Sequence, residues 1–213
     1  MGVDAQHRQV VMQVKDPQLT RDIAQGRPIK LNLGSGGGAG ERDGFYGVDI
    51  RDAPGVSVVC DLERGLPLPD ACVEMIYSSH FFEHVRDLTS LMRECQRLLQ
   101  KGGRMDITVP HFSCPHFYSD PTHVRFFGLH TMNYFAAPGG HKGSPAPRYE
   151  PDIRFIVDRV SIELMPRSLL ERLTTPFLQD WINRDYAALD RYERRFCWLA
   201  PAYTVRYELT VDK

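Results

Sequence analysis

The stretch that decides the fold runs from Ile29 to Asp61 and contains IKLNLGSGGG (29–38), FYGVDI (45–50) and VSVVCDL (56–62). Its three apolar runs end in the glycine turn that starts at Gly34, in Asp49 and in Asp61. A glycine-rich turn after a buried strand lets a ligand approach the backbone closely, because glycine has no Cβ. A carboxylate at the tip of the next strand can accept both hydrogen bonds of a ribose diol. The stretch therefore predicts a nucleoside site at the carboxyl edge of a parallel sheet.

The glycines of GSGGGA also match the dinucleotide-binding pattern G-x-G-x-x-G/A. In that motif the glycines open a helix whose N-terminus binds a pyrophosphate. Only GGAGERDG (37–44) separates Gly36 from the next strand, which is too short for a full crossover helix. Asp49 also follows the glycines sooner than the spacing of about 20 residues in a dinucleotide site. A nucleoside with a short charged tail and no phosphate fits better, and S-adenosylmethionine is such a ligand.

Three further motifs are LPLPD (66–70), SSHFFEHV (78–85) and LLQKGG (98–103). With the first stretch they resemble the class I S-adenosylmethionine-dependent methyltransferases over roughly residues 29–110. The resemblance implies an α/β, Rossmann-like fold with a mostly parallel seven-stranded sheet whose last strand is antiparallel. The sequence departs from the family at Asn32, where an acid usually stands, and in its shortened first helix. Both features occur in a compact subgroup of the family, and they bear on how the methionine tail is bound.

The resemblance also implies S-adenosylmethionine as the cofactor and assigns residues by position. The first glycine turn meets the methionine tail, Asp49 holds the ribose, and Asp61 with the Leu62 amide meets the adenine edge. His80, at the end of the strand predicted over 73–80, lies beside the sulfonium. The expected cofactor-binding residues are Leu33, Gly34, Ser35, Gly36, Asp49, Ile50, Asp61, Leu62 and His80. The structural alternative is that His80, Glu83 and His84 form a strand-to-helix junction and hydrogen-bond the backbone of that junction.

The composition predicts one soluble domain over residues 1–213. Its 26 basic and 27 acidic residues give a formal charge of −1, which argues against a nucleic-acid partner. The five cysteines are scattered without a C-x-x-C pair, as in a reducing compartment. No apolar run approaches the roughly 18–20 residues of a membrane span, and no signal peptide is recognisable. We therefore expect a cytoplasmic protein that has a small-molecule substrate and no membrane or nucleic-acid partner.

The remaining elements are predicted from local patterns. Asp16-Pro17 and Gly26 delimit a helix over 17–25, preceded by a short strand in QVVMQVK (9–15). A second helix, with apolar residues from 88 to 99, is expected to end at Lys101-Gly102-Gly103, before a strand over 103–110. The alternating runs 153–166 and 201–213 predict the last two strands. An amphipathic helix or helix pair fills 176–199, where aromatic residues leave a homodimer face as an option.

The segment 111–135 contains His111, His116, Asp120, His123 and His130, and the substrate half, about 111–202, begins there. Three interpretations are open: substrate binding or proton transfer, a metal site of His111, His116, Asp120 and His123, or structural histidines. We favour the first and expect no metal, because prolines 115 and 121 interrupt any helical face and the spacing matches no known metal pattern. Asp120-Pro121 predicts a helix cap that fixes the direction of His123.

The predicted catalytic residues are accordingly His123 and His111, with His123 preferred. The predicted substrate-binding residues are His84, Tyr118, Asp120, Arg125 and Arg148. The Pro/Gly-rich segment 136–152 is either a disordered surface loop or, as we favour, a lid over the substrate. A lid would bring Arg125, Lys142 and Arg148 to an anionic group of the acceptor.

These features predict methyl transfer from S-adenosylmethionine to an oxygen or nitrogen of a small-molecule acceptor, in natural-product or glycan biosynthesis. Two alternatives stay open. One is a different reaction of the same cofactor, such as transfer of another group or metal-assisted chemistry. The other is a non-catalytic S-adenosylmethionine-binding module, against which the histidine-rich segment argues, because pure binding does not need it.

Overall fold

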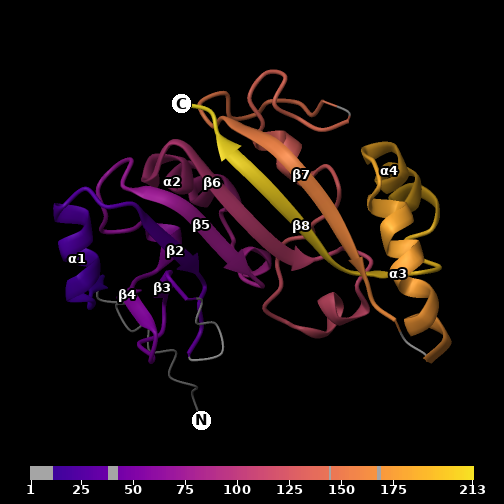
Figure 1. The fold of residues 1–213 in the computed structure, drawn as a ribbon, viewed down its shortest axis with the longest axis horizontal. Helices are drawn as coiled ribbons and strands as arrows, with labels where there is room; N and C mark the ends of the chain where they lie inside the picture. Colours follow the sequence, from indigo (N-terminus) through magenta and orange to yellow (C-terminus); the bar gives the residue numbers. More distant parts are fainter. Residues whose placement is uncertain (1–11, 38–42, 144, 167–168) are drawn as a thin grey trace, which may run out of the picture.

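The computed structural model describes residues 12–37, 43–143, 145–166 and 169–213. Its centre is one mixed sheet with the strand order β1-β4-β3-β2-β5-β6-β8-β7 (Figure 1). The strands are β1 (Gln13–Val14), β2 (Ile29–Leu33), β3 (Tyr46–Asp49), β4 (Val56–Val59), β5 (Val73–Ser79), β6 (Leu99–Pro110), β7 (Phe155–Leu164) and β8 (Ala202–Val211). The helices are α1 (Pro17–Ala24), α2 (Leu88–Leu98), α3 (Leu169–Asn183) and α4 (Tyr186–Arg195).

The strands from β2 to β6 run parallel. All residues of β4 and nearly all of β2 are buried, as expected for parallel strands that are covered on both faces. Strand β8 lies between β6 and β7 and is antiparallel to both. This arrangement confirms the predicted Rossmann-like fold with an inserted antiparallel strand. The sheet has one strand more than predicted, because β1 pairs antiparallel with β4 at its edge.

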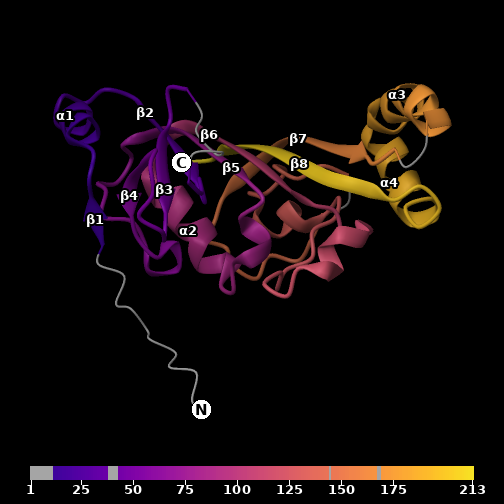
Figure 2. The same cartoon turned by 90° about the horizontal axis from the view of Figure 1, so that it is seen from below.

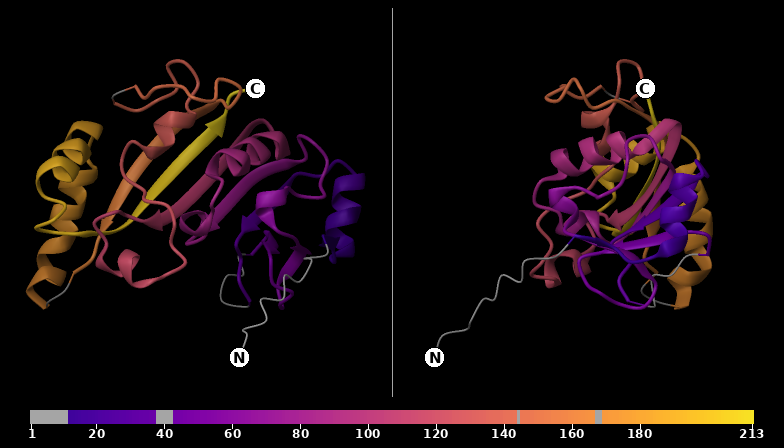
Figure 3. Two further views of the ribbon diagram at one scale, coloured as in Figure 1. Left: turned by 180° about the vertical axis from the view of Figure 1, so that it is seen from behind. Right: turned by 90° about the vertical axis from the view of Figure 1, so that its left-hand side faces the viewer.

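Helix α1 begins at the predicted cap, and α2 begins at a cap that was not predicted. The Asp16 carboxylate accepts the Gln18 N–H at 2.8 Å ahead of α1, and the Asp87 carboxylate accepts the Ser90 N–H at 2.9 Å ahead of α2. Figure 2 shows α2 on one face of the sheet, with α1 and the α3–α4 pair toward its two ends. The view from behind in Figure 3 shows the same separation of the helices. None of the helices in the described ranges is long and apolar enough to cross a membrane.

The end of α2 differs from the prediction. The helix ends at Leu98 and β6 begins at once with Leu99, before the glycines that were expected to stop it. Leu99 pairs with Val73 of β5, and the register then shifts so that Arg104 pairs with Met75. Gly102, at φ +72°, lies within this irregularity. The glycines therefore form a bulge at the start of β6 instead of a helix cap.

The segment 136–152 has no helix or strand among its described residues. Arg93 of α2 forms ion pairs with Glu150 at 2.7 Å and with Asp152 at 2.8 Å. The segment then leads into Phe155, which begins β7 opposite Val211 of β8, at the amino edge of the parallel strands. Its last part is thus held on α2, at the edge away from the carboxyl ends where the ligand was predicted. This position does not fit the lid hypothesis.

Arg97 fastens the turn 66–70 to α2. Its guanidinium donates to both carboxylate oxygens of Glu94, each at 2.7 Å, and to the carbonyls of Leu66 at 3.1 Å and Leu68 at 2.9 Å. The Glu94 carboxylate also accepts the Leu66 N–H at 2.7 Å. Burial opposes ionisation of Glu94, but the Arg97 guanidinium outweighs it and lowers the pKa of the carboxyl. One arginine thus closes the turn that precedes β5.

We predict that Arg97→Ala lowers the free energy of unfolding by about 2 kcal/mol, because it leaves a half-buried carboxylate and two carbonyls without their donor. For a chain of this size the melting temperature should fall by roughly 4–8 °C in calorimetry. Arg27→Ala is the control, since Arg27 pairs with Asp22 at 3.1 Å on the surface. It should cost less than about 0.5 kcal/mol. Equal melting temperatures for the two variants would contradict this role of Arg97.

Candidate functional site

A pocket of about 480 Å³ opens at the carboxyl ends of β2 to β5. The strand order reverses here, because β2 pairs with β3 on one side and with β5 on the other. Loops that leave the sheet in opposite directions form a crevice at such a point, where open α/β sheets bind ligands. The pocket is lined by Gly34, Gly36, Asp49, Ile50, Arg51, Cys60, Asp61, Leu62, Glu63, His80, Phe81, His84, Val85 and Thr122.

The glycine turn after β2 is held by Asp49. Its two carboxylate oxygens accept the N–H groups of Gly36 and Arg51, each at 2.8 Å. Gly34 and Gly36 have φ of +68° and +62°, which favours glycine. A Cβ on Gly34 would also lie only 2.4 Å from Phe81. Each Asp49 oxygen has a second lone pair left, so the carboxylate can hold the turn and still accept a ribose hydroxyl.

The adjacent acid, Asp61, follows β4 and caps the short 3₁₀ turn Leu62–Arg64. Its carboxylate accepts the Glu63 N–H at 3.1 Å. Cys60 beside it is buried, and burial raises the pKa of its thiol to about 12. The thiol therefore stays protonated and contributes a neutral wall. Together with Asp49 and Glu63, Asp61 gives this side of the pocket acidic groups that suit a cationic ligand.

Most of the predicted cofactor residues converge on this pocket, namely Gly34, Gly36, Asp49, Ile50, Asp61, Leu62 and His80. Two do not line it. Leu33 is fully buried in the core, and Ser35 lines a separate hollow that contains Asn32 and Tyr46. The backbone of β2 thus delivers the turn, while these two side chains point away from the pocket.

His80 ends β5 in an unusual conformation. Its φ is +55°, which is uncommon for a residue with a Cβ, and its N–H donates to the Thr108 carbonyl at 2.9 Å. This turn sends the chain across the pocket into the 3₁₀ turn Phe82–His84. The His80 ring lies with Nδ1 3.3 Å from Glu83 Oε1. This turn therefore places the His80 ring at the pocket and Glu83 directly behind it.

A cluster of Glu83, His84 and His123 forms behind the pocket wall. One ligand atom of each residue lies within 4.8 Å of the others. Glu83 is fully buried, and His123 Nε2 lies 4.0 Å from Glu83 Oε1 and 3.7 Å from Asp120 Oδ2. The two imidazole rings meet edge to face, with their centroids 4.8 Å apart. His84 is the member that lines the pocket.

Backbone contacts bring the two parts of this cluster together. The Glu83 carbonyl accepts the N–H groups of Val124 at 2.8 Å and Arg125 at 3.2 Å. The Arg125 guanidinium donates to the carbonyls of Val85 and Arg86. Arg125, which was predicted to bind substrate, thus attaches segment 120–125 to the turn after β5. His123 is fixed by this attachment, and it does not lie in the helix that the sequence predicts.

Asp120 forms a turn with Thr122 instead of capping a helix. Its Oδ1 accepts the Thr122 N–H at 2.8 Å and the Thr122 hydroxyl at 2.6 Å. These hydrogen bonds, led by the one from the hydroxyl, lower the pKa of the Asp120 carboxyl. No regular helix follows in residues 121–126. The prediction of a helix was wrong because Asp-Pro-Thr satisfies its backbone locally, in an Asx turn.

His111 lies apart from this cluster. It is fully buried, and its Nδ1 accepts the Ser113 N–H at 3.1 Å. Its Nε2 must then carry the proton, which it donates to Glu193 Oε1 at 3.1 Å. Both ring nitrogens are engaged, so His111 has none free for an acceptor, and this geometry does not support its predicted catalytic role. His116 is exposed, so the four residues that were weighed as an alternative metal set do not come together either.

Two predicted substrate residues also lie elsewhere. Tyr118 donates its hydroxyl to the Phe112 carbonyl at 2.8 Å and lines an aromatic hollow of about 430 Å³. Arg148 donates to the Pro151 carbonyl at 2.9 Å within its own loop. Of the predicted substrate residues, His84 alone lines the pocket itself, and Asp120 lies against the cluster through His123. Among residues outside the prediction, Thr122 also lines the pocket.

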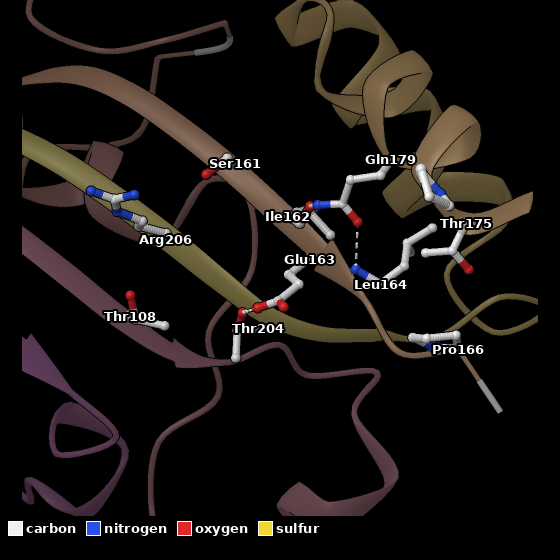
Figure 4. A pocket seen from close by; sticks show the side chains of 11 residues that line it. Thr108, Ser161, Ile162, Glu163, Leu164, Pro166, Thr175, Gln179, Thr204 and Arg206 are labelled. Carbon is white, nitrogen blue, oxygen red and sulfur yellow. Dashed lines mark hydrogen bonds between the residues drawn. The ribbon is translucent and has the colours of Figure 1, made fainter. Parts of the chain in front are cut away.

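A further cavity, of about 530 Å³, lies between β6, β7, β8 and α3 (Figure 4). It shares no lining residue with the pocket at the carboxyl edge. Several of its polar side chains are already hydrogen-bonded: the Thr204 hydroxyl donates to Glu163 at 3.0 Å, and Gln179 accepts the backbone N–H of Leu164 at 2.8 Å. Arg206 pairs with Asp106 at 2.7 Å. Because these polar groups are already hydrogen-bonded or ion-paired within the protein, we interpret the cavity as part of the polar face of the sheet.

Comparison with known proteins agrees with the geometry of the pocket. A family model described as a methyltransferase domain matches residues 44–107. This stretch contains β3, β4, β5, α2 and most of β6, and therefore most of the strand ends that form the pocket. No curated protein matches the chain.

Several solved structures share the fold. A SAM-dependent methyltransferase from Archaeoglobus fulgidus superposes with a TM-score of 0.54 at 20% identity, over 91% of this chain and 91% of that one. Phosphoethanolamine N-methyltransferase 2 from Haemonchus contortus superposes with a TM-score of 0.51 at 17% identity, over 87% of this chain and 49% of that one. Its structure contains phosphomonomethylethanolamine and S-adenosylhomocysteine. A second structure of that enzyme, with S-adenosyl-L-methionine, gives a TM-score of 0.50 at 17% identity, over 87% and 48% of the chains.

This chain thus spans about half the length of the Haemonchus enzyme. At such low identity the structural likeness establishes the fold. This likeness confirms the predicted fold class, and the domain match over residues 44–107 agrees with the predicted reaction class and cofactor.

We predict that Asp49→Ala weakens S-adenosylmethionine binding at least about tenfold in calorimetry, because a hydrogen bond to a charged group contributes about 1.5–3 kcal/mol. Asp52→Ala is the matched control, since it removes a neighbouring carboxylate that pairs with Lys15 and does not line the pocket. Its affinity should equal that of the wild type. An unchanged affinity of Asp49→Ala would remove Asp49 from the site.

Proposed function

We propose that this chain, a class I S-adenosylmethionine-dependent methyltransferase, methylates an oxygen or nitrogen atom of a small-molecule acceptor. The cluster of Glu83, His84 and His123 carries the proposal. His84 lines the cofactor pocket, and the other two side chains lie directly behind it. An acceptor that reaches the methyl group along this wall meets groups able to take its proton.

The reaction is an in-line displacement. A bond forms between the acceptor atom and the methyl carbon while the carbon–sulfur bond breaks, and the sulfonium becomes a neutral thioether. Because the cofactor arrives already activated, holding the acceptor in line supplies much of the rate, on the order of 7–11 kcal/mol. A hydroxyl or ammonium acceptor must also lose a proton, and a positioned base contributes about 10²–10⁴-fold.

The proposed roles of the cofactor residues are those that the family resemblance implies, and their positions around the pocket support them. Gly34 and Gly36 present backbone to the methionine tail, and Asp49 accepts the ribose hydroxyls. Asp61 and the Leu62 N–H meet the adenine, and His80 lies near the sulfonium. In this proposal the chain works as one domain over 1–213, with the cofactor half at about 29–110 and the substrate half at about 111–202.

An aromatic hollow on the same segment as His123 supports a small acceptor. Phe112, Tyr118, Phe126, Tyr134 and Trp198 line it, with Glu193 and His130 among its polar groups. Phe117 connects it to the cluster, because its ring lies 4.7 Å from Phe126 and 4.9 Å from His123. Aromatic faces of this kind suit a sugar ring, a flat molecule or a cationic amine.

The wider setting is inferred from the same features. The Haemonchus enzyme with this fold was solved with phosphomonomethylethanolamine, a small amine. The formal charge of −1 gives no general attraction to nucleic acid. Both support a small molecule as the acceptor, and natural-product or glycan biosynthesis in the cytoplasm is the setting that we propose.

We predict that His123→Ala reduces turnover by about 10²-fold or more, while cofactor affinity stays near that of the wild type, because His123 does not line the cofactor pocket. Turnover is measured as S-adenosylhomocysteine formed with a panel of small hydroxyl and amine acceptors. His116→Ala, which removes an exposed histidine, is the control and should keep full turnover.

The counterpart is His111→Ala, which should behave in the opposite way. It should lose about 2 kcal/mol of stability, because the hydrogen bonds to Ser113 and Glu193 are broken in the interior, and it should keep its turnover per folded molecule. If His111→Ala stops turnover without loss of stability while His123→Ala does not, the active site has been assigned to the wrong histidine.

A further inference from the structure

The carboxylate of Glu83 is in an unusual electrostatic position. It is fully buried, and within the described part of the chain neither of its oxygens has a hydrogen-bond partner. A buried carboxylate without partners is costly, so such groups are almost always paired or bound to a metal ion. The nearest basic atom is His80 Nδ1 at 3.3 Å, which forms an ion pair only when the imidazole is protonated and lacks the geometry of a hydrogen bond. The site therefore calls for a cation.

The two histidines beside Glu83 each engage one ring nitrogen elsewhere. His123 Nδ1 donates to the Phe117 carbonyl at 2.9 Å, because a carbonyl can only accept. The Thr122 hydroxyl donates to Asp120, so His84 Nδ1 must donate to that hydroxyl, at 2.9 Å. Both neutral rings thus keep Nε2 as a lone pair. Histidines that bind metals are held in this way, with the other ring N–H on a carbonyl or a polar oxygen.

The distances favour an ion over a proton. A protonated His123 would place its Nε2–H toward carboxylate oxygens at 4.0 Å and 3.7 Å, which is too long for hydrogen bonds. Zinc binds imidazole nitrogen at about 2.0–2.1 Å and carboxylate oxygen at about 2.0–2.2 Å. Two ligands of one tetrahedral ion therefore lie about 3.4 Å apart. The three ligand atoms of the cluster lie within 4.8 Å of one another, so side-chain rotations that shorten these separations would let one ion bind all three.

We propose that Glu83, His84 and His123 form a binding site for one divalent transition-metal ion, of the zinc or iron(II) class. Two imidazoles and one carboxylate are a ligand set that such ions use while keeping positions open, whereas magnesium and calcium prefer oxygen ligands. Asp120 Oδ2, with its Oδ1 already held by Thr122, is adjacent and can act as a further ligand. This set differs from the one considered from the sequence and includes Glu83, which comes from the other half of the chain.

The role of the ion rests on the proposed function, and the ion takes the place of the histidine base in it, because the ion uses both Nε2 lone pairs. Because His84 and Thr122 belong both to this cluster region and to the pocket wall, the ion lies beside the cofactor pocket. A hydroxyl acceptor bound to a divalent cation loses its proton at a lower pH, as metal-bound water does. The proton passes to solvent, the oxygen attacks the methyl carbon, and the sulfonium sulfur keeps the electron pair of the broken bond. The products are the methyl ether and S-adenosylhomocysteine.

Cobalt(II) titration of the chelator-treated, full-length protein tests the site directly. The expected result is one ion per chain, with a visible absorption band typical of coordinated cobalt, that zinc displaces. His84→Ala and His123→Ala should each weaken binding by about 100-fold or more. Glu83→Gln serves as a third variant, provided that it folds. His116→Ala, which removes an exposed histidine outside the cluster, should bind as the wild type does.

The outcomes separate this inference from the proposed function. Binding that is absent in the wild type, or unchanged in both His84→Ala and His123→Ala, overturns the metal site, and methyl transfer can still be measured. Cobalt binding that depends on the cluster, in a protein with no methyl transfer to any acceptor, supports the site and removes the role given to the ion. Turnover that survives complete chelation, with His123→Ala still inactive, would leave the base as the catalytic role of the cluster and would overturn the role given to the ion.

Discussion

The reversal of strand order between β2 and β5 is the constraint on which the site depends. The two strands are neighbours, and the Ser78 hydroxyl of β5 donates to the Leu33 carbonyl of β2 at 3.0 Å. Their continuations diverge, one toward β3 and the other toward β6, and the crevice between them is the pocket. The positions of the glycine turn, of Asp49 at the end of β3 and of the turn at His80 all depend on this single reversal.

The second half of the site is added to this crevice through the backbone. The Glu83 carbonyl receives two N–H groups from 124 and 125, and Arg125 returns two hydrogen bonds to the carbonyls of 85 and 86. Neither segment is regular helix or strand at these contacts, so each depends on the other for its shape. The chemistry of the site thus arises where a cofactor-binding loop and the segment after β6 hold one another.

Local sequence patterns were enough to predict the cofactor side. Gly34, Gly36 and Asp49 could be placed because short strands, glycine turns and parallel pairing together leave little choice of geometry. The roles of the histidines could not be predicted in the same way. His111 and His123 both follow β6, but only the path of an irregular chain decides that one is engaged by Ser113 and Glu193 while the other faces Glu83. Asp120-Pro121 has the form of a helix cap, yet Thr122 takes both hydrogen bonds of a turn. The burial of Glu83 depends on residues about forty positions away in the sequence, and no local pattern reports it.

The insertion of β8 has a consequence for the dynamics of the molecule. Strands β6 and β7 do not touch through hydrogen bonds, since β8 lies between them and pairs with both. Helices α3 and α4 contact the sheet at β7. The unit from β7 to α4 is therefore joined to the parallel strands through the ladder between β6 and β8, and Glu193 of α4 adds a hydrogen bond with His111 after β6. In hydrogen exchange β7, β8 and the helix pair should behave as one cooperative foldon, distinct from the strands that bind the cofactor.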